Sequence, residues 1–438
     1  MVFAHGIGGS ADLPISMPFA LAGGAAALAV SFLVLVLAWR KPRFDGDHQG
    51  HPVPPWLARL VDGGALTAVL RGLGLVFTGY VVWAALAGED RLTNPTFGVV
   101  YVLLWVGIVP ASLLLGPFYK AVNPVRTVHW LLSRATGGDP ATGMVRLPAW
   151  VGLWPAALGL LAFVWLELVA PESNYLWTIR LWFAVYFVVV LVGAAVFGER
   201  WIAAADPFEA YSTLVAHLSP WGRTADGTLV WRSPMRNLDA VRPVPGLVAA
   251  VSVLLGSTAF DSFQDSLAWV RFTSEHDFPD VPLNTAALVL FCVAVALLFA
   301  AATTAAPPET GVGRAGLPAL FAHSLVPIVV GYMVAHYLNY FVEVGQQTLI
   351  HLSDPMSDGS DLLGTADLQV NYWLTLHPGF LATSKVVAIV AGHVLGVVAA
   401  HDRAMKLLPV RHQLTGQLPL LVVMVGFTLG GLYLLLTV

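Results

Sequence analysis

The feature that most constrains this chain is a series of ten apolar runs, each about as long as a membrane-spanning helix. A bilayer with a hydrocarbon core about 30 Å thick needs about 20 apolar residues per helix. Only 11% of the 438 residues are charged, against about 25% in an average soluble domain. This composition excludes a soluble enzyme, a disordered protein and a nucleic-acid-binding protein. The runs lie at about 18–40, 65–87, 97–117, 149–170, 176–198, 244–263, 283–304, 317–346, 380–402 and 417–437.

The runs predict an all-α fold, a polytopic transmembrane helical bundle of about ten spans. No soluble domain interrupts them, so we expect residues 1–438 to form a single integral membrane domain. Lys and Arg concentrate in cytoplasmic segments of membrane proteins. If the N-terminus lies outside, 17 of the 22 Lys and Arg residues fall on the cytoplasmic side. This bias predicts that both termini face outward.

The outer segments are acidic, and one of them is long. The loop at about 347–379 contains the turn-forming sequences Ser353-Asp354-Pro355 and Ser357-Asp358-Gly359. Loops of this length are more often functional than decorative. The acidic residues either solvate the outer surface or form a funnel for cations.

Two cytoplasmic segments begin in the same way, with Asn123-Pro124 and Asp206-Pro207. An Asn or Asp followed by Pro is typical of a helix N-cap and first turn. Both segments predict amphipathic helices on the inner membrane surface, and spans 3–4 and 5–6 would form a weak internal repeat. The apolar stripes would consist of Val125, Val128 and Leu132 in one helix and of Phe208, Tyr211 and Val215 in the other.

The eighth run carries the strongest candidate site. His336, Tyr340, Glu343 and Gln347 lie within about 60° on one side of a helix with 3.6 residues per turn. Ionisable groups inside a membrane are costly and need a partner or a water-filled cavity. His336 and Glu343 can bind a transition metal, exchange protons, or belong to an ion path. The alternative is a hydrogen-bond network that only fixes helix packing.

Other candidates lie on runs 6 and 9 and near the outer surface. Asp261, at the outer end of run 6, is either an ordinary end-of-helix carboxylate or part of an outer-leaflet site. Lys385 either forms an ion pair with Glu343 or extends toward the interface. Gly392 and Gly396 permit close helix approach beside a buried His393. The full set has Glu343, Asp261 and Lys385 as catalytic candidates and His336, Glu343, His393, His351 and His377 as metal ligands.

No sequence motif identifies a cofactor, although a divalent transition metal such as zinc, iron or copper suits these ligands. His323 lies 13 residues before His336, a spacing that leaves a single haem open but disfavours two. Residues 2–4 before His5 fit the small-residue rule for signal cleavage, and a mature amino-terminal His5 could chelate copper. Walker A, GxSxG and HExxH motifs are absent, so ATP-driven transport and α/β-hydrolase chemistry have no support.

Several stretches, covering most of the chain, resemble an actinobacterial family of polytopic membrane proteins commonly labelled fenitrothion hydrolase. The resemblance implies hydrolysis of an organophosphate ester in a bacterial plasma membrane. It transfers no catalytic residue to this sequence. The stretches are His5-Gly6-Ile7-Gly8-Gly9, 205–209, 219–223, Gly256-Ser257-Thr258-Ala259-Phe260-Asp261, Ala335-His336-Tyr337, Ser353-Asp354-Pro355 and Gly392-His393.

Three functions remain open at this point. The first is a metal-dependent hydrolase with its site in the outer half of runs 6, 8 and 9, where a metal polarises an ester oxygen and activates water. The second is a transporter or ion-conducting protein, supported by the polar stripe and the repeat. The third is a haem- or copper-binding redox or assembly component. The expected partners are the lipid bilayer and an unidentified small molecule or ion, with no nucleic acid. No protein partner is indicated.

Overall fold

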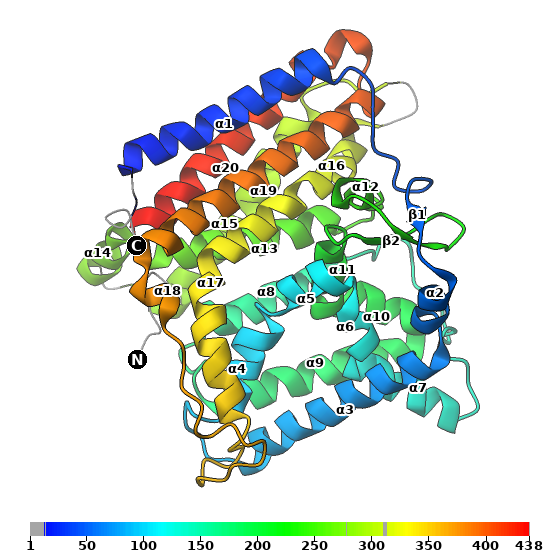
Figure 1. Cartoon of the computed structure of the whole chain (residues 1–438), viewed down its shortest axis with the longest axis vertical. Helices are drawn as coiled ribbons and strands as arrows, with labels where there is room; N and C mark the ends of the chain where they lie inside the picture. Colours follow the sequence, from blue (N-terminus) through cyan, green and yellow to red (C-terminus); the bar gives the residue numbers. More distant parts are fainter. Residues whose placement is uncertain (1–12, 14, 277, 310–312, 438) are drawn as a thin grey trace. The chain divides into compact units, whose positions relative to one another are not determined.

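A computed structural model describes residues 13, 15–276, 278–309 and 313–437, and helices dominate it (Figure 1). The predicted class, an all-α helical bundle, is confirmed. The expectation about His5 lies outside the described residues. Within the described residues, the only strands are β1 (His51–Pro52), β2 (Trp221–Arg223) and β3 (Leu229–Trp231), which form an antiparallel sheet in the order β1-β3-β2.

Eight helical segments in the described part of the chain are long and apolar enough to cross a membrane. This is the pattern of a multi-pass membrane protein, and each segment falls on one of the predicted runs. They are α1 (Met17–Ala38), α3 (Gly64–Ala87), α9 (Leu176–Phe197), α13 (Leu247–Gln264), α15 (Asp280–Thr304), the segment Arg314–His351, α19 (Pro378–Leu407) and the segment Thr415–Leu436. Most of this last segment is α20 (Leu418–Thr437). The segment Arg314–His351 comprises η3 (Arg314–Gly316), α16 (Leu317–Phe321), η4 (Ala322–Leu325) and α17 (Val326–His351).

The third run is bent instead of straight. It consists of α4 (Pro95–Gly98), the π-helix η2 (Val99–Leu104) and α5 (Ile108–Leu115), with a 47° bend. In η2 the amide of Trp105 donates to the carbonyl of Val100, 3.2 Å away. This spacing of five residues adds one residue to the turn, and such π-bulges are a common cause of bends.

The fourth run is shorter than predicted. Its helix, α8 (Trp154–Leu168), has 15 residues, whereas the hydropathy pattern predicts a span over 149–170. Gly152 has φ of +43° and lies in the turns that precede the helix. Pro155 occupies the first turn of α8, where its fixed φ is compatible with a helix start.

The contacts divide the chain into two compact units. Unit 1 comprises residues 1–49, 234–339 and 372–438, and unit 2 comprises 50–233 and 340–371. The single-domain expectation stays a prediction. The shorter helices of unit 1 are α12 (Pro234–Asp239), α14 (Leu267–Glu275), α18 (Trp373–Leu376), η5 (Val410–His412) and η6 (Thr415–Gln417). Those of unit 2 are α2 (Pro55–Val61), α6 (Phe118–Val122), α7 (Pro124–Ala135), α10 (Glu199–Ala205) and α11 (Pro207–Ala216).

Glycines allow close helix contacts in unit 1. A Cβ added at Gly256 on α13 would lie 2.6 Å from the Cα of Cys292 on α15. A Cβ added at Gly392 on α19 would lie 2.5 Å from the carbonyl oxygen of Pro327 on α17. Small residues at such crossings let two backbones approach each other, as predicted for Gly392. Figure 1 shows α1, α19 and α20 running side by side, and these helices also contact one another.

The prediction that both Asn/Asp-Pro helices lie on the membrane surface is wrong for α11. Nine of its ten residues are buried, and it packs against α5, α6 and α8. Its predicted stripe is therefore only one part of a helix that is enclosed on all sides. In α7, Val125 is buried and Leu132 is exposed, so the predicted stripe does not form one uniform face.

The two segments share a local chain path. Gly116 and Gly198, with φ of +77° and +73°, precede the short helices α6 and α10. Asn123 and Asp206 then cap α7 and α11. Glycine suits both turns because positive φ is costly for other residues. The repeat of spans 3–4 and 5–6 stays a prediction, and this shared path is consistent with it.

Candidate functional site

The main candidate site in unit 1 joins α13 to α17 through Asp261 and His336. The Oδ2 atom of Asp261 lies 2.8 Å from Nε2 of His336 and accepts a hydrogen bond of 2.6 Å from the hydroxyl of Tyr337. Asp261 is 2% exposed and His336 is 5% exposed. Both helices belong to candidate spans. A titratable pair is therefore buried where a charge without a partner would be costly.

The hydrogen bonds continue beyond this pair. The Oγ atom of Ser262 lies 3.1 Å from Nδ1 of His336, and the Tyr332 hydroxyl donates to the same Oγ over 3.1 Å. Gln264 donates to the Oδ1 atom of Asp261. We call the chain formed by Tyr332, Ser262, His336 and Asp261 the relay. The neutral imidazole that fits it donates from Nε2 to Asp261 and accepts at Nδ1 from Ser262.

The relay can hold and exchange a proton. Imidazole is the side chain that ordinarily exchanges a proton near neutral pH, and the Asp261 carboxylate lies within hydrogen-bond distance of its Nε2 atom. The hydroxyls of Ser262 and Tyr332 can each accept one proton and donate another. The arrangement is that of a general acid–base pair with a hydroxyl in contact with it.

Three other predicted residues of unit 1 lie on α19 or at its start. Lys385 and His393 are both 1% exposed on α19. His393 lies 2.9 Å from the carbonyl of Ile389 through Nδ1, and its Nε2 has no partner among the described residues. His377 is exposed and stacks on Trp373.

Glu343 and His351 lie on the second half of α17, which belongs to unit 2. Glu343 is buried and His351 is half-buried. Within the described residues, no three His, Cys, Asp or Glu side chains form a group that could hold a metal ion. The predicted ligands are therefore not gathered into a site by the described part of the fold.

The predicted outer loop begins later than expected, because α17 continues to His351. Its acidic residues organise turns. Although burial raises the pKa of Asp354, hydrogen bonds from the backbone of Gly359 and Asp358 bring that pKa below its usual value. The Ser353 hydroxyl and the backbone amide of Ala366 lower the pKa of Asp361. Both carboxylates thus have local structural partners, which weakens the interpretation of this loop as a cation funnel.

A second buried polar group, in unit 2, was not predicted. It consists of Asn123, Arg126, Asp206 and Glu209, and we call it the capping cluster. Arg126 donates to Glu209 from Nε over 3.0 Å and from Nη2 over 2.6 Å. Asn123 donates to Asp206 over 2.8 Å and to Glu209 over 3.0 Å. All four residues are at most 4% exposed. The cluster ties the beginning of α7 to the beginning of α11.

Asp206 receives several donors. The amides of Phe208 and Glu209 donate to its Oδ1 atom, and the Tyr186 hydroxyl donates to Oδ2 over 2.7 Å. Burial, and then the negative charge of Glu209, raise the pKa of Asp206 to about 6 despite these hydrogen bonds. Asp206 lies between α10 and α11, outside the candidate spans. It is still mostly ionised at pH 7.

The sequence contains a signal for this cluster. Arg126 follows the cap Asn123 by three residues, and Glu209 follows the cap Asp206 by the same three residues. Each charge therefore lies in the first turn of its helix, and the two charges have opposite signs. Equal spacing after two similar caps predicts a pairing that hydropathy alone does not reveal.

Comparisons with known proteins add no relative, since no protein-family model, no curated protein and no solved structure matches this chain.

Proposed function

We propose that the protein moves protons, or a solute together with protons, across a membrane, with the Asp261–His336 pair as the proton-binding site. The observation that supports this is the 2.8 Å contact between two buried titratable groups on candidate spans. Such groups inside a bilayer commonly belong to proton or ion pathways. A bacterial plasma membrane is part of the proposal and rests on the family resemblance. Outward-facing termini rest on the distribution of Lys and Arg.

The relay supplies a site that takes up and releases one proton. When Nδ1 of His336 takes up a proton, the Ser262 hydroxyl can no longer donate to it. Ser262 can then donate to the carbonyl of Thr258, 3.3 Å away, and present its lone pairs to the imidazolium. Release of the proton from Nδ1 restores the first arrangement.

Proton flux into proteoliposomes tests the proposal. A potassium gradient with valinomycin imposes a membrane potential, and an internal pH-sensitive dye reports the flux. We expect at least about a tenfold loss in His336→Gln and Asp261→Asn, because neither replacement side chain ionises near neutral pH. Glutamine retains a donor and an acceptor, which preserves packing better than alanine does.

His323→Gln is the matched control. His323 is also a buried histidine of unit 1, but its Nδ1 lies 3.1 Å from the backbone carbonyl of Leu320 instead of a carboxylate. Its variant should keep the wild-type flux. The proposal fails if the wild-type protein gives no more flux than protein-free vesicles, or if His336→Gln and His323→Gln behave alike.

Ester hydrolysis is the second candidate, supported by the 3.1 Å contact between Ser262 and His336. A hydroxyl, an imidazole and a carboxylate in sequence can activate the hydroxyl as a nucleophile. The resemblance to the fenitrothion hydrolase family points the same way. A fluorophosphonate probe should label Ser262 in the wild-type protein and not in Ser262→Ala. Metal and absorbance analysis of the same preparation tests the metal-dependent and haem alternatives.

A further inference from the structure

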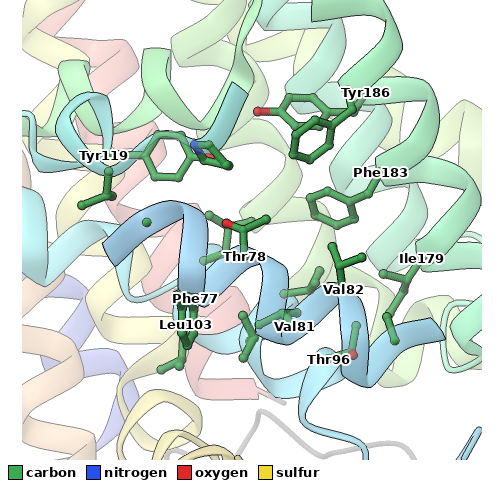
Figure 2. A pocket seen from close by; sticks show the side chains of 18 of the residues that line it. Phe77, Thr78, Val81, Val82, Thr96, Leu103, Tyr119, Ile179, Phe183 and Tyr186 are labelled. Carbon is green, nitrogen blue, oxygen red and sulfur yellow. The ribbon is translucent and has the colours of Figure 1, made fainter. Parts of the chain in front are cut away.

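Unit 2 contains an apolar cavity of about 590 Å³ between α3, η2 and α9 (Figure 2). Its volume falls within the range of about 300–1,000 Å³ typical of sites for small organic ligands. Figure 2 shows Tyr119 and Tyr186 at one end and Thr96 and Ile179 at the other. Between these ends the lining is almost entirely aliphatic or aromatic.

Helix α3 forms one wall of the cavity. Of its residues, only Ala84 and Ala85 are buried, although α3 is a candidate span. Its lining residues run from Leu73 to Leu86, about 20 Å at 1.5 Å per residue. One leaflet of a bilayer is about 15 Å of hydrocarbon, half of the roughly 30 Å core. The cavity is therefore long enough for a single extended acyl chain.

One cation lines this cavity. Arg180 lies four residues from the start of α9, about 6 Å along the helix. Its Nε donates to the carbonyl of Ala85 over 2.5 Å. Among the described residues, the guanidinium has no other hydrogen-bond or ion-pair partner. The contact with Ala85 holds it at the cavity and leaves its two terminal nitrogens available.

A guanidinium with free donors beside hydrocarbon matches one kind of occupant. Planar N–H pairs bind phosphate and carboxylate oxygens with two parallel hydrogen bonds. A charge near the end of a candidate span is stabilised by an opposite charge. We infer that unit 2 binds an anionic phospholipid, with one acyl chain in the cavity and the phosphate on Arg180. This inference is independent of the proton site in unit 1.

Lipid retention tests the inference. The purified, delipidated full chain is incubated with equal amounts of phosphatidylglycerol and phosphatidylcholine of identical chains, and bound lipid is counted by native mass spectrometry. A parallel arm replaces both with palmitate. Both lipids have the phosphate, but the choline of phosphatidylcholine adds a positive charge that Arg180 repels. We therefore expect about a tenfold preference for phosphatidylglycerol, which corresponds to about 1.4 kcal/mol. Arg180→Gln should remove the preference. Arg91→Gln, which removes an arginine of unit 2 already paired with Glu89, should retain it.

A second pair of variants tests the cavity itself. Thr78 lies within the lining in Figure 2, so Thr78→Phe should fill the space and abolish retention of phosphatidylglycerol. Gly79→Phe adds the same ring at the next position, where an added Cβ meets nothing within 4 Å, and should bind as the wild type does. Equal retention of both phospholipids by the wild-type protein, or a preference for palmitate, would overturn the inference. Retention unchanged by Thr78→Phe would also overturn it.

Discussion

Asp261 in unit 1 and Asp206 in unit 2 are both almost fully buried, but they obtain their hydrogen bonds from different sources. Asp261 lies within α13, and its partners are the side chains of His336, Tyr337 and Gln264. Asp206 precedes α11, and two of its partners are backbone amides. Amides within a helix are already paired, whereas the first four are free.

This difference distinguishes a carboxylate that can exchange a proton from one that fixes the start of a helix. A carboxylate held by side chains has partners that can rotate or titrate, so the Asp261 site can change its protonation without unwinding a helix. A carboxylate held by backbone amides stabilises the start of a helix and is fixed with it. We therefore expect variants of the capping cluster to affect stability most, and variants of the relay to affect proton flux most.

The largest expected effect is loss of the Arg126 side chain. Arg126→Met leaves Glu209 buried without its cation, and removing one partner of a buried pair costs about 3–5 kcal/mol. Unfolding in detergent, followed by fluorescence against denaturant, measures this. The double variant Arg126→Met/Glu209→Leu should recover part of the loss, because the unpaired charge of Glu209 is gone while Glu199, 3.0 Å from Nη1 of Arg126, still lacks its cation. A loss below about 1 kcal/mol in the single variant would contradict the pairing.

The second largest effect is the dependence of the unfolding free energy on pH that Asp206 causes. Its pKa of about 6 exceeds the usual 3.8, so the folded state binds a proton more tightly than the unfolded chain. The stability associated with this proton is fully present below about pH 3.8 and is lost as pH rises through 6. Two pKa units correspond to about 3 kcal/mol.

The difference in unfolding free energy between wild type and Asp206→Asn isolates this contribution, because asparagine does not titrate. This difference should change by up to about 3 kcal/mol between pH 4 and pH 7, because the wild type loses stability relative to Asp206→Asn as the pH rises. A difference that is constant across this interval would show that Asp206 titrates alike in both states.

A smaller effect is expected for Asp261→Asn in unit 1. The asparagine oxygen can take the place of Oδ2, which faces both His336 and Tyr337. Its amide group then replaces Oδ1 and faces the Gln264 donor, which costs about 2 kcal/mol. Asp265→Asn, at an exposed carboxylate just after α13, should cost less than about 0.5 kcal/mol. If both variants cost the same in a denaturant titration, the hydrogen bonds of Asp261 contribute nothing specific to unit 1.

The smallest loss expected from removing a hydrogen bond concerns a helix cap of unit 1. The hydroxyl of Ser266 accepts a hydrogen bond from the Trp269 amide at the start of α14. Ser266→Ala should cost about 1 kcal/mol, the usual value for a lost cap, with no pH dependence. A cost equal to that of Arg126→Met would remove the distinction between an ordinary cap and the capping cluster.

Hydropathy was sufficient to predict the helical class and the positions of most long helices, because apolar length is a local property. The caps at Asn123 and Asp206 were also predicted, since an Asn or Asp before Pro acts on its own helix. The burial of α11 was not predicted. An apolar stripe reveals one face of a helix, while Glu209 on another face is neutralised by Arg126, 83 residues away in sequence.

The candidate site was predicted in part for a similar reason. Helical periodicity places His336 on a polar side of its helix, but it cannot say which helix lies opposite. The structure brings Asp261 to His336 and leaves His377 exposed. Ser262 and Tyr332 were missed because hydroxyls carry no charge and are common within apolar runs. Their role depends on their distance to one imidazole.

The short helix α8 has a consequence for the membrane around the protein. Its 15 residues rise about 22 Å, several ångströms less than the hydrocarbon thickness of an average bilayer. Leu158 on α8 is exposed, so part of this helix is available to meet acyl chains. If α8 crosses the bilayer, as the apolar run at 149–170 predicts, lipid beside it has to compress to match, and compression costs less for shorter chains. A spanning α8 should therefore collect short-chain lipids along this edge and make the protein less stable in thick bilayers.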